Sequence, residues 1–249
     1  MIMHTISLPQ APKYTEISPS HGKMEILECY PGYGTTLGNA IRRVLLSSLE
    51  GAAVTSVKIK GVTHEFTTMP GVMEDIVQII LNLKQVRFRM VSDEPMNISL
   101  KSKGEGKVTA GDFKLSTGLE VVNPDQVIAT LSDKKAEIDM EVEVARGIGY
   151  IPVEQQAREK EIGRIAVDAI YTPVKRVNFE VENMRVGKRT DYDKITIEIM
   201  TDGTLSPDRA FNKAIDILMN QFSALVSDEV MEAPKLVKGA KKKSVKKDA

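Results

Sequence analysis

The chain has 249 residues, and its 34 basic side chains balance 34 acidic ones. A 42% apolar fraction with 27% charged residues is ordinary for a soluble globular protein and excludes a wholly disordered chain, while the single cysteine, Cys29, excludes an internal disulfide and a multi-thiolate zinc site. No apolar run reaches the roughly 18 residues that span a bilayer, and the first ten residues lack a secretory signal pattern, so we expect a cytoplasmic protein.

The first predicted helix runs from about Thr36 to Leu49. Its apolar residues recur at helical spacing and cover about half of the helix circumference: Leu37, Ala40, Ile41, Val44, Leu45 and Leu49. Leu46 lies outside this stripe, on the opposite face together with Arg43. A helix with a wide apolar face and a leucine among arginines on the other side is expected to contact two different neighbours.

The second predicted helix covers Val72–Lys84. Pro70 and Gly71 mark its start, and Lys84 at its end suits the helix dipole. Its apolar residues spread well beyond a single line: Val72, Ile76, Ile79, Ile80, Leu81 and Leu83. We therefore expect this helix to be covered on most sides.

The third predicted helix has the clearest start signal. Ser206 is the expected N-cap, Pro207 the first helical residue, and Asp208 an acid in the first turn. A heptad seam of two repeats follows, formed by Phe211, Ile215, Leu218, Phe222 and Leu225. Two repeats are too short for an independent coiled coil, but they suit packing against a symmetry mate or a neighbouring helix.

The segments between the second and third helices alternate polar and apolar residues, which predicts half-buried strands. The alternation is strict over residues 137–144 and recurs over 177–181 and 195–199. Shorter strand candidates lie at residues 54–60, 63–67, 86–90, 98–101 and 126–131. The predicted fold class is therefore α+β, with more strands than helices.

No motif in the sequence predicts catalysis or a bound cofactor or metal. The glycines of residues 32–38 are spaced one residue off the dinucleotide fingerprint and lack a Walker lysine, so a tight turn into the helix is preferred, with Gly38 admitting another helix. His64 lies in a predicted strand and suits a structural hydrogen bond. Asp191 and Asp193 come nearest to clustered magnesium ligands, but Asp-x-Asp in a polar loop is usually solvated.

The segment Glu182–Lys194 joins two well-patterned strands and is rich in both charges. Long loops on rigid scaffolds are more often functional than short ones. Since the sequence offers no catalytic constellation, we expect this connection to dock a partner, the alternative being a mobile, solvated hairpin tip.

A free-standing enzyme and a sequence-reading DNA-binding module are the competing classes of function for the whole chain.

Five stretches of the chain together resemble one family. They are GYGTTLGNAIRRVLLSSLEGAAVTSVKIKGVTHEF, PGVMEDIVQIILNLK, GLEVVNPDQVIATL, RGIGYIPVE and VENMRVGKRTDYDKITIEIMTDGTLSP. In this order, from about residue 20 to residue 226, they resemble the amino-terminal domain of bacterial and plastid DNA-directed RNA polymerase alpha subunits.

The resemblance implies a homodimer that serves in transcription as the assembly platform for the beta and beta-prime subunits. The chain itself would have no catalytic residues, and the catalytic magnesium is expected in beta-prime. The implied architecture is a discontinuous dimerisation subdomain, a sheet plus two packed helices from residues 1–50 and 172–232, with an inserted, strand-rich second subdomain over residues 51–171.

The resemblance also assigns roles to residues. In the family the first and last helices of the dimerisation subdomain pack against their copies, a role that falls here on Leu37, Ile41, Val44, Leu45, Phe211, Ile215, Leu218, Phe222 and Leu225. Arg43 matches the arginine that holds the beta subunit, with Leu46 beside it, and Lys84 matches a second large-subunit contact. The remaining expected large-subunit contacts lie in the charged connection: Arg185, Arg189 and Asp191.

Family members usually continue into a helical carboxy-terminal domain that binds upstream promoter DNA and activators, whereas this chain stops after a lysine tail. Residues 233–249 are predicted to be disordered, and residues 235–249 hold seven lysines and one aspartate, which leaves −6 on the rest of the chain. We therefore expect contact with promoter DNA only through the holoenzyme or weakly through the tail. No membrane contact is expected, and the location would be the bacterial cytoplasm at the nucleoid, or a plastid.

Overall fold

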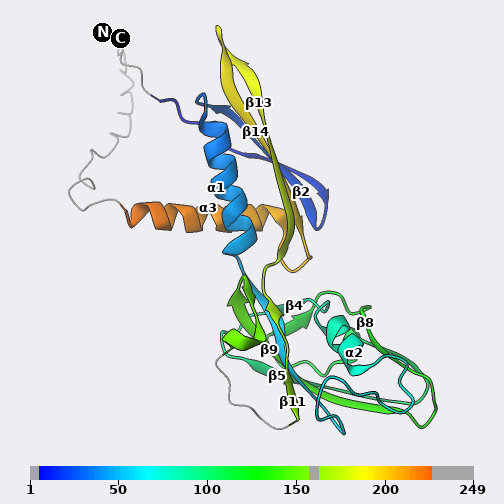
Figure 1. Ribbon diagram of the computed structural model, residues 1–249. Helices are drawn as coiled ribbons and strands as arrows, with labels where there is room; N and C mark the ends of the chain where they lie inside the picture. Colours follow the sequence, from blue (N-terminus) through cyan, green and yellow to red (C-terminus); the bar gives the residue numbers. More distant parts are fainter. Residues whose placement is uncertain (1–5, 157–162, 226–249) are drawn as a thin grey trace, which may run out of the picture.

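The computed structural model describes residues 6–156 and 163–225 and has two parts (Figure 1). The terminal unit comprises residues 6–49 and 172–225, and the middle unit comprises residues 50–156 and 163–171. Strands of mixed lengths and three α-helices within the described residues confirm the predicted α+β class. The division into subdomains at residues 50 and 171 stays a prediction, and the predicted tail lies outside the described residues.

The terminal unit is a four-stranded antiparallel sheet in the order β1-β2-β14-β13, covered on one face by two helices (Figure 1). Its strands are β1 (Lys13–Ser18), β2 (His21–Cys29), β13 (Val174–Val186) and β14 (Arg189–Thr201). The alternation of β14 points Ile195, Ile197 and Ile199 into a core that is completed by α1 (Tyr33–Ser47) and α3 (Pro207–Ser223). This packing places the two helices across each other on the same side of the sheet.

The middle unit is built on a six-stranded sheet with the path β5-β9-β3-β4-β7 and with β11 paired to β3. Its strands are β3 (Glu50–Ile59), β4 (Phe88–Met90), β5 (Met96–Lys103), β7 (Leu119–Val121), β9 (Glu137–Ile148) and β11 (Arg164–Ala166). Two small ribbons add β6 (Gly106–Thr109) with β8 (Val127–Leu131) and β10 (Tyr150–Ile151) with β12 (Ala169–Ile170). Two 3₁₀ turns, η1 (Ala110–Asp112) and η2 (Val153–Gln155), and the helix α2 (Ile76–Leu83) complete the unit.

The three predicted helices are all present, and two of them, α1 and α2, start at other residues than predicted. The start of α3 at Pro207 is confirmed, although the Ser206 side chain makes no capping hydrogen bond. Helix α2 begins later than predicted, because Asp75 rather than the Pro70-Gly71 pair caps it and accepts a hydrogen bond from the backbone N–H of Gln78. Helix α1 begins at Tyr33, so the glycine-containing turn forms its first residues.

One strand prediction and one loop prediction are wrong. Residues 63–67 form bends and turns instead of a strand, which also removes His64 from a sheet. The charged connection is not a long loop: β13 and β14 continue through it and pair as far as Val186 and Arg189, and only Gly187 and Lys188 form the turn. The predicted docking segment is therefore the rigid end of a long hairpin, which projects beyond the start of α1 (Figure 1).

The chain passes between the two units twice, and the two crossings touch. The first crossing leads from α1 into β3 through Gly51, and the second leads from β12 into β13 through Tyr171. A Cβ atom at Gly51 would lie 1.8 Å from the carbonyl oxygen of Tyr171, so only glycine permits this approach. Gly147 of β9 lies under the ring of the same tyrosine, where a Cβ would be 2.6 Å from Cε2.

Candidate protein-docking surfaces

Helix α3 has a buried first half and an uncovered second half. Phe211 is only 2% exposed in the core of the terminal unit, and Ile215 and Leu218 are partly buried against the same core. Beyond them Phe222 is 60% and Leu225 81% exposed, because the helix has passed the sheet and α1 (Figure 1). The predicted heptad seam is thus one continuous stripe that starts inside the chain and ends on its surface.

The expected dimerisation residues of α1 also serve the chain's own core. Ile41 and Leu45 are buried between the helix and the sheet, and Leu37 and Val44 are partly buried against them. The apolar character of Ile41, Leu45 and Phe211 is accounted for by the chain's own core. The role of all nine expected residues in dimerisation stays a prediction, and six of them are not fully enclosed by the core: Leu37, Val44, Ile215, Leu218, Phe222 and Leu225.

The start of α1 is capped from the neighbouring strand β14. Asp193 is 7% exposed, and its Oδ2 accepts hydrogen bonds from the backbone N–H groups of Gly32 at 3.0 Å and Gly34 at 2.9 Å. The carboxylate satisfies helix N–H groups that Gly32, the residue at the cap position, cannot satisfy with a side chain. The prediction of a solvated Asp193 is therefore wrong. The sequence did contain a signal for its burial: residues two apart on a strand share a face, so the alternation indicates that Asp193 lies on the same inward face as Ile195.

Two glycines let α1 lie directly on the sheet. A Cβ at Gly34 would be 2.7 Å from Cγ1 of Val181, and a Cβ at Gly38 would be 2.5 Å from the ring of Phe179. Both neighbours belong to β13, so the prediction that Gly38 admits another helix is wrong and the close approach is to a strand. The glycine run therefore positions α1 closely on the sheet.

The tip of the β13–β14 hairpin is ordered by a salt bridge between aromatic rings. Nε of Arg189 lies 3.0 Å from Oδ1 of Asp191 and Nη2 lies 2.7 Å from Oδ2, while the guanidinium sits 5.2 Å from the ring centroid of Tyr192 and 5.8 Å from that of Tyr30. The hydrogen bonds from Arg189 hold the pKa of Asp191 below its ordinary value, and the same bonds raise the pKa of Arg189. Arg185 is exposed nearby and donates to the carbonyl of Gly187.

Arg43 and Leu46 lie on the outward face of α1, as predicted. Arg43 is exposed, and within the described ranges its guanidinium has no ion-pair partner. Leu46 is 37% exposed, and its carbonyl accepts a hydrogen bond from the Thr172 hydroxyl at 3.4 Å. An unpaired arginine beside an exposed leucine has the composition of an interface anchor.

Lys84 closes α2 and is already paired within the chain. Its Nζ lies 3.2 Å from Oδ2 of Asp168, whose Oδ1 accepts a hydrogen bond from the backbone N–H of Val153 at 3.1 Å. These contacts, the Val153 bond foremost, lower the pKa of Asp168. Beside the ion pair an apolar groove runs between α2 and β11, lined among others by Val77, Ile80, Leu81, Ile165 and Val167.

The expected large-subunit contacts do not form one site. Arg185, Arg189 and Asp191 lie at the hairpin tip, Arg43 and Leu46 lie on α1, and Lys84 lies in the middle unit (Figure 1). In the part of the chain that the structure describes, no group of three or more His, Cys, Asp and Glu side chains is placed to hold a metal ion. Of the described helices, none has the length and apolar character needed to cross a membrane.

Comparison with known proteins gives concordant matches. A family model described as the RNA polymerase Rpb3/RpoA insert domain matches residues 57–172. The DNA-directed RNA polymerase subunit alpha of Symbiobacterium thermophilum is 50% identical over 209 residues, 84% of this chain and 66% of the relative. The same subunit of Roseiflexus sp. is 46% identical over 226 residues (91% and 69%), and that of Aquifex aeolicus is 45% identical over 213 residues (85% and 67%). The chain spans about two thirds of the length of these relatives.

Proposed function

Because the chain belongs to the family of bacterial DNA-directed RNA polymerase alpha subunits, we propose that it is the homodimeric platform on which the beta and beta-prime subunits assemble. The observation that supports this most is the uncovered second half of α3. Met219, Phe222 and Leu225 are each more than half exposed, and large apolar side chains gathered at one helix end indicate an interface.

A second copy of the chain is the proposed cover for this surface. Burying three large apolar side chains on each of two protomers is worth about 9–18 kcal/mol in total, against association costs of about 4–15 kcal/mol. The partly buried residues Ile215 and Leu218 extend the same stripe toward the core and would add to the gain. A stable dimer is therefore energetically reasonable.

The large subunits would bind at surfaces that the dimer leaves free. Arg43 and Leu46 are the proposed anchors for beta, since an exposed arginine without a partner in the described chain can pair with an acidic group of another subunit. Lys84 with the groove along α2, and the hairpin tip with Arg185, Arg189 and Asp191, are proposed as further contacts with beta or beta-prime. We assign no catalytic group to this chain, and we expect the catalytic magnesium in beta-prime and contact with promoter DNA through the holoenzyme.

Two substitutions, each with a matched control, test the two parts of the proposal by two measurements. Phe222→Asp places a charge in the dimer seam and should yield monomers by light scattering, whereas Lys213→Asp, at an exposed position on the same helix, should leave dimers. Arg43→Ala should leave dimers but abolish co-purification of the beta subunit, whereas Arg42→Ala should retain it. Dimers of Phe222→Asp would refute the seam, and unimpaired capture of beta by Arg43→Ala would refute the anchor.

A further inference from the structure

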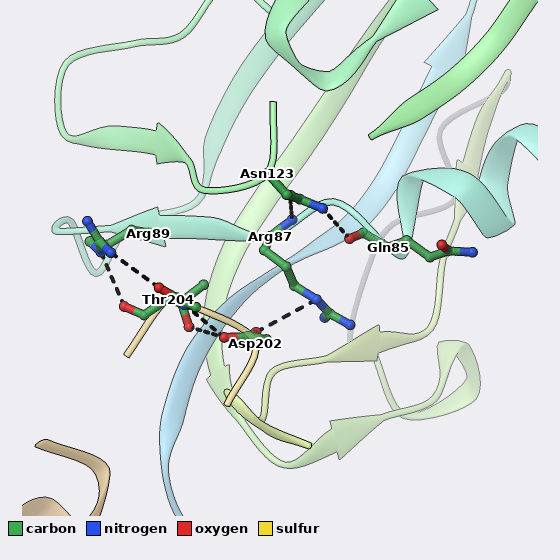
Figure 2. Close-up of polar contacts among 7 residues, drawn as sticks. Gln85, Arg87, Arg89, Asn123, Asp202 and Thr204 are labelled. Atoms are coloured by element: carbon green, nitrogen blue, oxygen red, sulfur yellow. Dashed lines mark hydrogen bonds and ion pairs between the residues drawn. The ribbon is translucent and has the colours of Figure 1, made fainter. Parts of the chain in front are cut away.

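The angle between the two units is not fixed by the chain crossings alone. The crossings touch at Gly51 and Tyr171 and lie side by side, so together they form a single narrow connection. A connection of this kind permits hinge motion unless a further side-chain contact between the units opposes it. The structure contains such a contact between the turn that precedes α3 and the strand β4 (Figure 2).

On the terminal side the contact is a tight turn over residues 202–204. Asp202 holds the turn together, because its Oδ1 accepts hydrogen bonds from the backbone N–H of Thr204 at 2.9 Å and from the Thr204 hydroxyl at 2.6 Å. Gly203 has a φ of 95°, a conformation that favours glycine. The backbone N–H of Asp202 also donates to the carbonyl of Pro173, which ties the turn to the second crossing.

On the middle side two arginines reach this turn. Nε of Arg87 lies 3.7 Å from Oδ2 of Asp202, and the Asp202 side chain is only 6% exposed. Nε of Arg89 donates to the carbonyl oxygen of Thr204 at 3.2 Å, and its Nη1 pairs with Glu120 of its own unit at 2.8 Å. A nearly buried carboxylate that loses its arginine is left uncompensated, so this contact resists opening.

The arginine side is itself held rigidly. Oδ1 of Asn123 accepts the backbone N–H of Arg87 at 2.7 Å, and Nδ2 of Asn123 donates to the carbonyl of Gln85 at 3.0 Å (Figure 2). The carbonyl of Arg87 accepts a further hydrogen bond from Val122. Both sides of the contact are therefore held in place before they meet, so forming the contact costs little conformational entropy.

We propose that Arg87, Arg89, Asp202 and Thr204 form a latch that holds the middle unit at a fixed angle to α3, with Asp202 as the positioning residue. The latch joins the last turn before the proposed dimer helix to the segment directly after Lys84 at the end of α2. If the proposed function holds, the latch sets the distance between Arg43 on α1, the proposed anchor for beta, and the proposed contact surface at Lys84 in the middle unit. A large subunit could then bind both surfaces at once.

The angle can be measured without any partner subunit. Spin labels on cysteines introduced at Lys107 of β6 and Lys213 of α3 report the distance between the units, since both positions are exposed. The native Cys29 is 1% exposed and will not compete for the label. Mixing the labelled full chain with an excess of unlabelled chain restricts the signal to distances within one protomer. The parent chain should give one narrow distance peak.

Two latch variants and one matched control follow. Asp202→Asn keeps an acceptor for Thr204 but loses the ion pair with Arg87. Arg89→Met loses the hydrogen bond to the Thr204 carbonyl. Both variants should broaden the distance peak and weaken capture of the large subunits. Lys103→Met breaks the ion pair with Glu137 inside the middle unit and should leave the peak unchanged. Circular dichroism would show that each variant is folded.

An unchanged narrow peak in both Asp202→Asn and Arg89→Met overturns the latch. A broadened peak with undiminished capture of beta and beta-prime overturns its role in assembly while leaving the latch in place. These outcomes are separable from failure of the proposed function, because the distance is read on the chain alone and the Arg43→Ala experiment does not depend on it.

Discussion

Helix α2 of the middle unit and helix α3 of the terminal unit bury their apolar residues in different ways. Along α2 the inward residues Ile76, Ile79 and Leu83 are fully buried from one end to the other, and only its outer face is exposed. Along α3 the cover stops halfway, so that Phe211 is enclosed and Phe222 is not. Apolar periodicity thus identifies the face of a helix that seeks contact, but it does not say whether that contact comes from the same chain.

The largest expected effect separates the two phenylalanines of α3. Phe211→Ala should lower the free energy of unfolding by about 3–5 kcal/mol, because it leaves a cavity in the terminal core. Phe222→Ala should leave the stability of the protomer nearly unchanged and weaken only the dimer. Urea unfolding at several protein concentrations distinguishes the two, since only an effect on the dimer depends on concentration.

A concentration-independent loss of several kcal/mol in Phe222→Ala would show that the second half of α3 is packed against its own chain. Leu218, partly buried between the two phenylalanines, is expected to give an intermediate result when changed to alanine. Such a gradient along one helix would sharpen the contrast with α2.

The next effect concerns the cap that β14 supplies to α1. Asp193→Ala should cost about 1–2 kcal/mol, because the amides of Gly32 and Gly34 lose their acceptor at the helix start. Asp193→Asn retains an acceptor and should cost less. Asp191→Ala is the matched control two residues away, where the side chain is 55% exposed and paired only at the surface, and it should change stability little.

Hydrogen exchange gives the second readout of this prediction. The amides of Gly32 and Gly34 should exchange faster in Asp193→Ala, while the buried amides of β14 should stay protected. Equal stability losses for Asp191→Ala and Asp193→Ala would mean that the cap contributes no more than the surface pair.

The parts of the fold that the sequence predicted correctly are those with local signals. The start of α3 is encoded by Ser206, Pro207 and Asp208 in succession, and the central parts of β13 and β14 by alternation over one buried face. The hairpin tip escaped prediction because both of its faces are exposed near Arg185 and Arg189, so alternation disappears although the backbone pairing continues.

The contacts between distant segments had no such signal. The latch joins Arg87 of the middle unit to Asp202 of the terminal unit, which lie far apart in the sequence, and each residue taken alone is an ordinary charged side chain next to a strand. Asp193 differs, because its alternation with Ile195 indicated that it lies on the buried face of β14. The polar residues around it nevertheless favoured the prediction of a solvated loop. A side chain's contact with a distant segment is predictable from the sequence only where a local pattern, such as strand alternation, shows which way the side chain points.

The smallest expected effect lies on the surface of the middle unit. The hydrogen bond from Val153 and the ion pair with Lys84 lower the pKa of Asp168 below its usual 3.8, so the folded state binds the proton less readily than the unfolded chain does. The stabilisation is therefore present above about pH 4 and is lost as the pH falls through the lowered pKa. Since the Asp168 side chain is 36% exposed, it should amount to less than about 1 kcal/mol.

Asp168→Asn should accordingly reduce the free energy of unfolding at neutral pH, and the gap to the parent chain should close as the pH falls below about 4. Asp125→Asn, at an exposed carboxylate of the same unit, should show no such gap. Denaturant unfolding at a series of pH values measures both. A gap that persists at the acid end would mean that Asp168 acts through packing rather than charge. A gap that closes would show that Asp168 acts through its charge, and its small size would let Lys84 exchange this partner for another at little cost in stability.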